Sequence, residues 1–226
     1  MAAYLISLSK IKRLFFLPFL LGIGFQAQAQ DPMRFQEEVA QINKKYPTHI
    51  QRENLALFTG SSSIKMWKDL DSYFPDHVVI NAGFGGSQTF ELLHYIKELV
   101  LDYKPKKVFI YEGDNDISSG KSSTEIILTM HELVGQINSA LPEVEIFLIA
   151  AKPSISRWHL KDQYLDLNKH FEEYSQLSDK VTFVDIWTTM LDAEGNPKAE
   201  IFLEDKLHMN QAGYDLWAEV VRDYLD

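Results

Sequence analysis

The chain has 226 residues, contains no cysteine and carries a formal net charge of −10 at pH 7. Without cysteine it cannot build a disulfide framework or carry a lipid on a cysteine side chain. Its acidic balance also repels nucleic acid and anionic lipid, because proteins bind both chiefly through Lys and Arg. We therefore expect neither nucleic acid nor an anionic membrane surface as a partner.

Residues 1–29 have the features of a secretory signal peptide. Basic residues within 10–13 precede an apolar run over 14–25, and the small residues Ala27 and Ala29 stand where a signal peptidase reads the chain. We predict cleavage after Ala29 and a secreted or periplasmic protein. Because the apolar run is short for a membrane span, we expect no stable membrane insertion after cleavage. An uncleaved N-terminal anchor is the alternative.

The remaining chain, residues 30–226, is long enough for one α/β domain with a sizeable core. Removal of the signal leaves 19 basic and 32 acidic residues, a net charge of −13. Internal repeats, low-complexity tracts and long linkers are absent from the sequence, so we predict a single domain. The oligomeric state has no signature in the sequence.

Five short apolar runs alternate with segments of helical periodicity along this domain. A polar helix is predicted first, with Asp31 as its cap, Pro32 at its first position and its end near Lys45. The apolar runs, which we predict as strands, are residues 55–59, 77–83, 107–113, 145–151 and 181–186. Further helices are predicted over residues 64–70, about 92–100, 126–141, about 160–175 and from about 211 onward.

The predicted strands are continuous in Val, Ile, Leu and Phe instead of alternating between apolar and polar residues. Such runs are typical of strands whose two faces are both covered by helices. The alternation of strands and helices predicts a parallel sheet in a three-layer α/β/α arrangement. In such a sheet ligands bind beyond the carboxyl ends of the strands, so we expect the loops at those ends to hold the functional groups.

Four of these loops carry groups suited to acyl transfer. A serine must lose its proton to attack a carbonyl carbon, so it needs a neutral imidazole nearby and a carboxylate to orient that imidazole. The oxyanion that forms needs donors such as backbone N–H groups or an amide side chain. The loops that offer these groups are Ser61 to Ser63, the glycine-rich segment 83–89, the segment 112–117 with Asn115, and the segment 204–210 with Asp205 and His208.

Each of these motifs also has a simpler interpretation. The serines would serve equally as a helix cap. The segment 83–89 lacks the third glycine of a dinucleotide site and the Lys-Ser/Thr ending of a phosphate loop, so it could be only a tight turn. Asp114 to Asp116 could be a solvated turn or part of a calcium loop, but no closing glutamate follows. Asp205 and His208 could be two zinc ligands, but no third ligand stands in a comparable motif, and we predict no metal site.

Taken in order, the motifs strongly resemble the four blocks of the SGNH hydrolases, also called the GDSL-like esterase and lipase family. The resemblance covers essentially the whole domain from Leu55 onward. The matching segments are GSSS at 60–63, NAGFGGSQT at 81–89, GDND at 113–116 and DKLHMNQAGY at 205–214. The resemblance implies that the nucleophile is Ser62, that the oxyanion hole is formed by Ser62, Gly86 and Asn115, and that the catalytic triad is completed by Asp205 and His208.

The resemblance also implies a fold and a mechanism. The expected fold is flavodoxin-like, with five parallel strands in the order 2-1-3-4-5, and the expected activity is that of a serine esterase without a metal or organic cofactor. One departure is visible, because Ser61 stands where the family usually has Asp. That Asp is not a catalytic group of the four blocks, so we expect activity to survive. The segment GSSSIKMW at 60–67 looks like the branch near platelet-activating-factor acetylhydrolase.

The expected substrate is a small-molecule, glycan or lipid ester. No long apolar insertion lies between Ile117 and Asp205 to form a lid, so we expect a shallow site and a short acyl group, such as acetyl on a carbohydrate. A lysophospholipase or thioesterase is the second interpretation. Trp67 and Trp158 could line a sugar subsite or simply pack. Two other classes stay open on the same scaffold: a non-catalytic carbohydrate-binding domain and a cofactor-binding flavodoxin relative.

Overall fold

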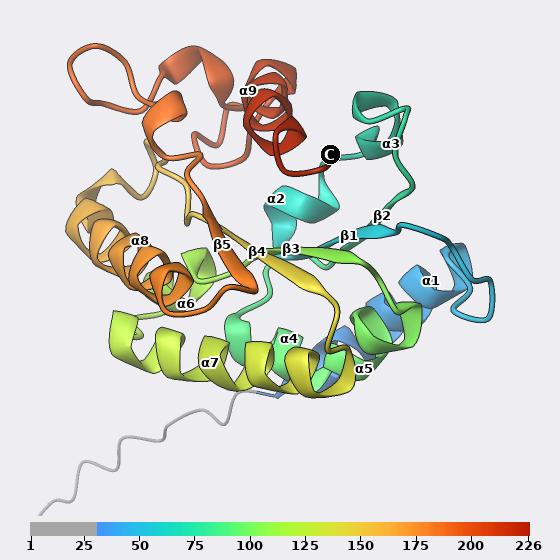
Figure 1. Ribbon diagram of the computed structural model, residues 1–226. Coiled ribbons are helices and arrows are strands. Elements are labelled where there is room, and N and C mark those ends of the chain that lie inside the picture. The colour runs from blue at the N-terminus through green and yellow to red at the C-terminus, as the bar shows by residue number, and fades with distance from the viewer. Residues whose placement is uncertain (1–30) are drawn as a thin grey trace, which may run out of the picture. The chain divides into compact units, whose positions relative to one another are not determined.

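The computed structural model describes residues 31–226, and the predicted signal peptide with its cleavage site lies outside this range. Five parallel strands of the described chain form a sheet in the order β2-β1-β3-β4-β5 (Figure 1). They are β1 (Ala56–Gly60), β2 (Val79–Gly83), β3 (Lys107–Tyr111), β4 (Glu145–Ile149) and β5 (Val181–Val184). The predicted parallel sheet and its strand order are confirmed.

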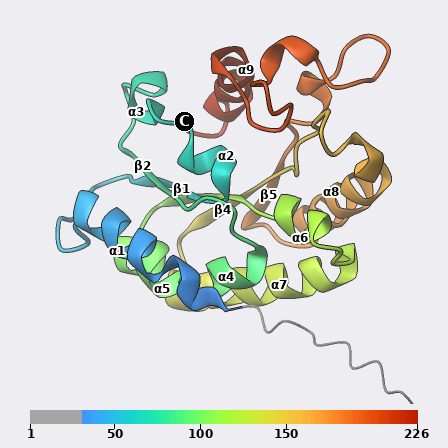
Figure 2. The same ribbon diagram turned by 180° about the vertical axis from the view of Figure 1, so that it is seen from behind.

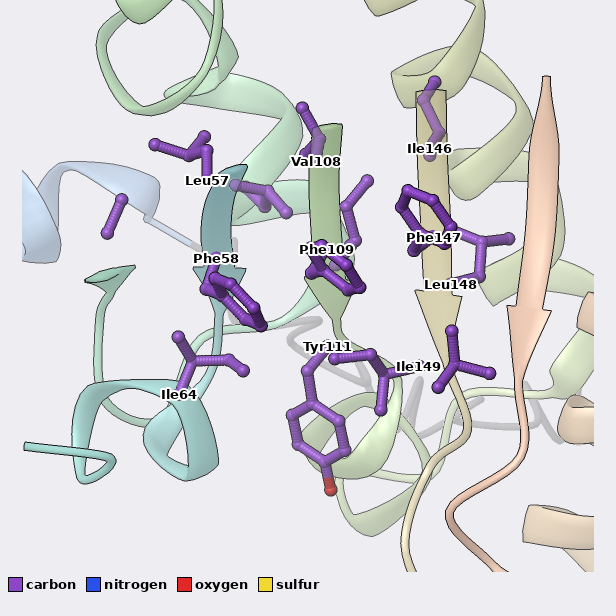
Figure 3. Close-up of a cluster of buried hydrophobic side chains, with 14 of the residues drawn as sticks. Leu57, Phe58, Ile64, Val108, Phe109, Tyr111, Ile146, Phe147, Leu148 and Ile149 are labelled. Atoms are coloured by element: carbon purple, nitrogen blue, oxygen red, sulfur yellow. The ribbon is translucent and has the colours of Figure 1, made fainter. Parts of the chain in front are cut away.

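A row of phenylalanine side chains from three neighbouring strands forms the centre of the sheet. Phe58, Phe109 and Phe147 occupy the same register, and their rings stack at centroid distances of 4.4 and 4.5 Å (Figure 3). Leu57 and Val108, one position earlier, are fully buried on the opposite face. Burial of each ring stabilises the fold by about 1.5–3 kcal/mol. This packing holds the carboxyl ends of β1 and β3 side by side.

Helices cover both faces of the sheet (Figures 1 and 2). One layer contains α1 (Gln36–Lys45), α4 (Thr89–His94), α5 (Ile96–Leu99), α7 (Ser123–Ala140) and α8 (Lys161–Gln176). The other contains α2 (Ser62–Lys65), α3 (Leu70–Tyr73) and α9 (Gln211–Arg222). Short helical turns are η1 (Pro32–Phe35), η2 (Leu101–Tyr103), α6 (Asp114–Ser118), η3 (Trp158–Leu160), η4 (Thr188–Met190) and η5 (Ala199–Ile201). The α/β/α arrangement is thus confirmed. None of the helices within residues 31–226 combines the length and the apolar character needed to cross a membrane.

The helix predicted over residues 64–70 is divided into α2 and α3. Asn81 on β2 explains the division. Its side-chain amide donates hydrogen bonds to the carbonyl oxygens of Ile64 (2.6 Å) and Trp67 (2.9 Å). Those carbonyl groups would otherwise accept bonds from the next helical turn, so the chain leaves the helix and starts again at Leu70.

Two further helices differ from the expectation. The helix predicted over 92–100 is divided at Tyr95, where the backbone leaves the helical region with φ −99° and ψ 18°. The first polar helix begins at Pro32 as predicted, but its first turn is a 3-10 turn that continues into α1. The strands β3, β4 and β5 end two residues earlier than predicted, because the chain there turns away from the sheet toward the functional loops, whereas β2 ends where predicted and β1 ends one residue later.

The direction in which the sheet grows reverses between β1 and β3. From β1 the chain adds β2 on one side, and it then returns to add β3, β4 and β5 on the other side. Gly60 and Tyr111 are paired at the carboxyl ends of β1 and β3. Sheets of this kind bind their ligands outside the carboxyl ends of the strands at such a reversal.

Candidate active site

The turn between β1 and α2 presents Ser62 at the carboxyl end of the sheet. The turn begins at Gly60, where a φ of +121° and a Cβ position only 2.0 Å from the Tyr111 carbonyl oxygen both require glycine. The amide of Ser61 donates to the same carbonyl oxygen (3.0 Å) and so ties the turn to β3. Ser62 is the first residue of α2, a position at which helix geometry leaves the backbone N–H without an intrahelical acceptor.

His208 lies beside Ser62, although 146 residues separate the two in the chain. Its Nε2 atom is 3.0 Å from Ser62 Oγ, and its Nδ1 atom is 2.6 Å from Asp205 Oδ2. Asp205 Oδ1 accepts hydrogen bonds from the amides of Leu207 and His208, both at 2.9 Å. Asp205 and His208 therefore share one tight turn before α9, and the structure brings them together with Ser62 in one hydrogen-bonded series.

The Asp205 carboxylate stays ionised far into the acid range. Desolvation raises its pKa, but the hydrogen bonds from the His208 ring and from the Leu207 and His208 amides outweigh that effect and lower the pKa to about 2. The side chain is 48% exposed, so solvent screens its interaction with a protonated imidazole. When Nδ1 donates to this carboxylate, Nε2 is the ring nitrogen that can accept a proton from Ser62.

Asn115 lies at the start of α6, after the sharp turn at Gly113 (φ +102°) that follows β3. Its Oδ1 atom is 3.2 Å from both terminal nitrogens of Arg157. Because a guanidinium only donates hydrogen bonds, this contact decides the orientation of the amide and turns Nδ2 toward the serine turn. Nδ2 donates to Ser61 Oγ (2.6 Å) and to the Ser87 carbonyl oxygen (2.9 Å).

The glycine-rich loop after β2 carries Gly86, the predicted backbone donor. Gly86 has a φ of +82°, and a Cβ at this position would meet no atom within 4 Å. The N-terminal helical segment anchors the peptide groups on either side: Glu38 accepts a bond from the Gly85 amide (3.0 Å), and Arg34 donates to the Gly86 carbonyl oxygen (3.1 Å). Arg34 is also paired with the buried Glu91 (2.8 Å). The Gly86 N–H is therefore held between two fixed peptide groups.

The three serines of the turn have different surroundings. Ser62 Oγ contacts the imidazole, whereas Ser61 is 1% exposed and directs its hydroxyl to the Asn115 amide. Ser63 is 2% exposed, and its carbonyl oxygen accepts a bond from the Tyr214 hydroxyl of α9 (3.0 Å). Of the three serines, Ser62, which the resemblance names as the nucleophile, is therefore the one whose hydroxyl contacts the imidazole.

The structure also bears on two alternatives that the sequence left open, a metal site and a sugar subsite lined by tryptophan. Within the described part of the chain, no three His, Cys, Asp or Glu side chains are grouped closely enough to hold a metal ion. Trp67 is 1% exposed and packs against Phe58 and Trp217 in the core, so it cannot line a subsite. Trp158 is half-buried and stacks on Trp187 at a centroid distance of 5.9 Å.

Three residues that hold the site together have no recognisable motif around them. Arg34 and Glu38 reach the glycine loop from 52 and 47 residues away, and they belong to a polar helical segment that gives no local signal. Arg157 reaches Asn115 from 42 residues away. It follows β4, whose loop carries none of the four motifs. A cation just beyond the carboxyl end of a strand is the signal that would have found it.

Comparison with known proteins agrees with this arrangement. The chain matches the GDSL-like Lipase/Acylhydrolase family over residues 59–216. No curated protein sequence matches it. Its fold is similar to that of a candidate platelet activating factor from Streptococcus pneumonia, with 23% identity, a TM-score of 0.74 and coverage of 87% of this chain and 100% of that chain.

Two other solved structures are similar in fold. A candidate acylhydrolase from Bacteroides fragilis has 21% identity and a TM-score of 0.73, with coverage of 87% of this chain and 97% of that chain. A catalytic mutant of Axe2, an acetylxylan esterase from Geobacillus stearothermophilus, has 16% identity and a TM-score of 0.63, with coverage of 78% and 95%. The family match spans most of the chain and includes all four motif loops. The chain therefore belongs to the GDSL-like lipase/acylhydrolase family and is an ester-bond hydrolase.

Proposed function

We propose that the protein is a secreted serine esterase that uses Ser62, His208 and Asp205 as its catalytic triad. One observation carries the proposal: the series of contacts from Ser62 Oγ to His208 Nε2 (3.0 Å) and from His208 Nδ1 to Asp205 Oδ2 (2.6 Å). Distances in this range allow direct proton transfer between a serine and its base. The ionised Asp205 favours the tautomer in which Nε2 is the acceptor.

The reaction proceeds in two halves through an acyl-serine. Ser62 Oγ attacks the ester carbonyl carbon while its proton passes to His208 Nε2, and the same nitrogen then gives the proton to the leaving alcohol. In the second half, water attacks the acyl carbon while its proton passes to His208 Nε2, and that proton returns to Ser62 Oγ as the bond between Oγ and the acyl carbon breaks and the carboxylic acid leaves. Asp205 stabilises the imidazolium in both halves without taking its proton.

The oxyanion of each tetrahedral intermediate is bound by the N–H groups of Ser62 and Gly86 and by the Asn115 amide. In the resting site both amide hydrogens of Asn115 are engaged, one by Ser61 Oγ and one by the Ser87 carbonyl oxygen. A charged oxygen is a stronger acceptor than a neutral hydroxyl. We therefore infer that the N–H bonded to Ser61 turns to the oxyanion as negative charge develops.

A short acyl ester of a carbohydrate or other small molecule is the proposed substrate, with acetyl as the first acyl group. The similarity in fold to an acetylxylan esterase supports a carbohydrate ester. The predicted signal peptide would bring the enzyme to extracellular glycans. Lysophospholipids and acyl thioesters form the second class of candidate substrates.

Hydrolysis of p-nitrophenyl acetate tests the triad. We expect turnover by the wild type and a loss of about 10³-fold or more in kcat for Ser62→Ala, because the attacking oxygen is removed. Ser61→Ala and Ser63→Ala are matched controls on the same turn and should keep kcat within about tenfold. Equal turnover by the wild type and Ser62→Ala, or turnover by neither, contradicts the proposal.

A substrate panel tests the acyl and alcohol preference. Acetylated xylooligosaccharides, lysophospholipids and acyl thioesters should be compared by kcat/KM. We expect the acetylated sugars to give the highest value, and a higher value for a lysophospholipid would move the proposal to the second class.

Export from a bacterial host tests the proposed location. N-terminal sequencing of the exported protein should find Gln30 as the first residue. Retention of residues 1–29 in a membrane fraction would instead support the uncleaved anchor.

A further inference from the structure

A buried lysine beside the site has no part in the steps described above. Lys152 follows β4, and its side chain is 1% exposed. Its Nζ atom donates a hydrogen bond to the Leu207 carbonyl oxygen (2.8 Å) and lies 3.5 Å from Asp114 Oδ2. Leu207 directly precedes His208, and Asp114 directly precedes Asn115. One ammonium group therefore joins the two loops that carry the base and the oxyanion amide.

The carboxylate on one side of Lys152 is firmly ionised. Asp114 accepts hydrogen bonds from Arg157 Nη1 (2.6 Å), from the Tyr111 hydroxyl (2.9 Å) and from the Tyr164 hydroxyl. Desolvation raises its pKa, but Lys152 and Arg157 outweigh that effect and lower the pKa to about 2. Figure 3 shows the Tyr111 hydroxyl extending past the end of β3, toward the loops that follow the strands.

The charges around Lys152 do not balance within this cluster. Two cations, Lys152 and Arg157, face the single carboxylate of Asp114, and the surplus is positive. Burial, together with the neighbouring Arg157, lowers the pKa of Lys152, and the negative charges of Asp114 and Asp205 only partly oppose this shift.

We propose that Lys152 is a positioning residue that holds the Asp205–His208 turn in register with the Asn115 loop. The proposal rests on the function proposed above for these residues. A bond to the Leu207 carbonyl oxygen restrains the peptide group that leads into His208, so it limits the positions that Nε2 can take relative to Ser62 Oγ. Displacements of about 1 Å in a catalytic contact can cost about 10²-fold in rate.

The test compares Lys152→Met with a matched lysine at the other end of the sheet. Lys107 on β3 also donates to backbone carbonyl oxygens, those of Tyr224 (2.9 Å) and Asp226 (2.7 Å). With p-nitrophenyl acetate, we expect Lys152→Met to lower kcat by about tenfold or more while KM stays within about twofold. Lys107→Met should leave both constants within about twofold of the wild type. A loss confined to kcat separates positioning from general weakening of the fold.

Hydrogen exchange gives a readout that needs no activity. In Lys152→Met, amides in the 203–209 segment should exchange faster than in the wild type, while those of β1 keep their protection. In Lys107→Met, the 203–209 segment should exchange as in the wild type. If the wild type fails to hydrolyse esters, the proposed function is wrong, and the exchange rates still decide whether Lys152 holds the turn.

Two outcomes would overturn the proposal. The first is a folded Lys152→Met with kcat and exchange in the 203–209 segment both unchanged. The second is that neither Lys152→Met nor Lys152→Gln folds at 25 °C while Lys107→Met does. Lys152→Gln is included because it keeps an N–H donor, on a side chain one bond shorter. In that case Lys152 acts on the stability of the whole domain, and the positioning role is rejected.

Discussion

At the scale of single residues, the carboxyl groups of Asp205 and Glu112 have surroundings that shift their pKa values in opposite directions. Asp205 is half exposed yet keeps its charge through three hydrogen bonds, whereas Glu112, after β3, is fully buried. Desolvation raises the pKa of Glu112 well above its usual value, and the hydrogen bond from Ser87 Oγ (2.6 Å) only partly opposes it. The surroundings therefore favour the charged form of Asp205 and the neutral form of Glu112.

The acid limb of the pH–rate profile should report the imidazole alone. Asp205 has a pKa of about 2 and stays ionised at milder acidity. A histidine base must be neutral to accept the serine proton, so turnover is lost as the imidazole becomes protonated. We expect log(kcat/KM) to fall with a slope of one on the acid side. A profile that is flat down to about pH 4 would count against His208 as the base.

Glu112 should make the folded state less stable as the pH rises. In the unfolded chain its carboxyl group loses its proton near the ordinary value of 4.5, while the folded state retains the proton to higher pH. The free energy of unfolding therefore falls as the pH rises from that value toward the raised pKa. Glu112→Gln cannot ionise, so it should remove this fall. Urea unfolding of both proteins between pH 4 and 8 measures it, and parallel pH dependences would refute the expectation.

At the scale of elements, the side chains of the site are positioned by short turns at the strand ends and less by the helices that follow them. The β1–α2 turn positions Ser62 through Gly60, and the turn after β3 positions Asn115 through Gly113; both glycines have positive φ. The four-residue helix α2 is too short to be stable by itself. It persists because Asn81 binds the carbonyl oxygen of Ile64 and the Ile64 side chain is buried.

Two glycine-to-alanine changes should have opposite effects on stability. At Gly60 a Cβ would lie 2.0 Å from a carbonyl oxygen at a φ of +121°, so Gly60→Ala should lower the free energy of unfolding by more than about 3 kcal/mol. Gly135 lies within α7 with no atom near its Cβ position. Gly135→Ala should therefore stabilise by about 0.5–1 kcal/mol. Urea denaturation measures both, and equal midpoints would contradict the assignment of strain to Gly60.

At the scale of the whole molecule, the site draws on residues from both ends of the described chain. Arg34 and Glu38 hold the glycine loop from the N-terminal side, and Asp205 and His208 approach from the C-terminal side. These contacts form only when the sheet and both helical layers are in place. Correct assembly of the domain is therefore a condition for an intact site.

Loss of the N-terminal contact should reduce turnover without unfolding the protein. Arg34→Ala removes the bonds to the Gly86 carbonyl oxygen and to Glu91. We expect kcat/KM to fall by about tenfold, because the Gly86 N–H is less firmly held. The matched control is Glu37→Ala, an exposed position three residues later, in the first turn of α1. Equal activities of the two variants with p-nitrophenyl acetate would exclude a role for Arg34 in the site.

The sequence by itself determined the parallel three-layer fold and the partnership of Asp205 with His208. Both depend on local patterns: continuous apolar runs identify buried strands, and a spacing of three residues lets one turn hold acid and base together. Only the tertiary structure decided the rest. It brought the Ser62 hydroxyl to the His208 ring, divided a helix through Asn81, and joined Lys152 to the turn before His208. These contacts join residues 17 to 146 positions apart, and such distant groups meet only when the packed sheet and its helices bring them within hydrogen-bond reach.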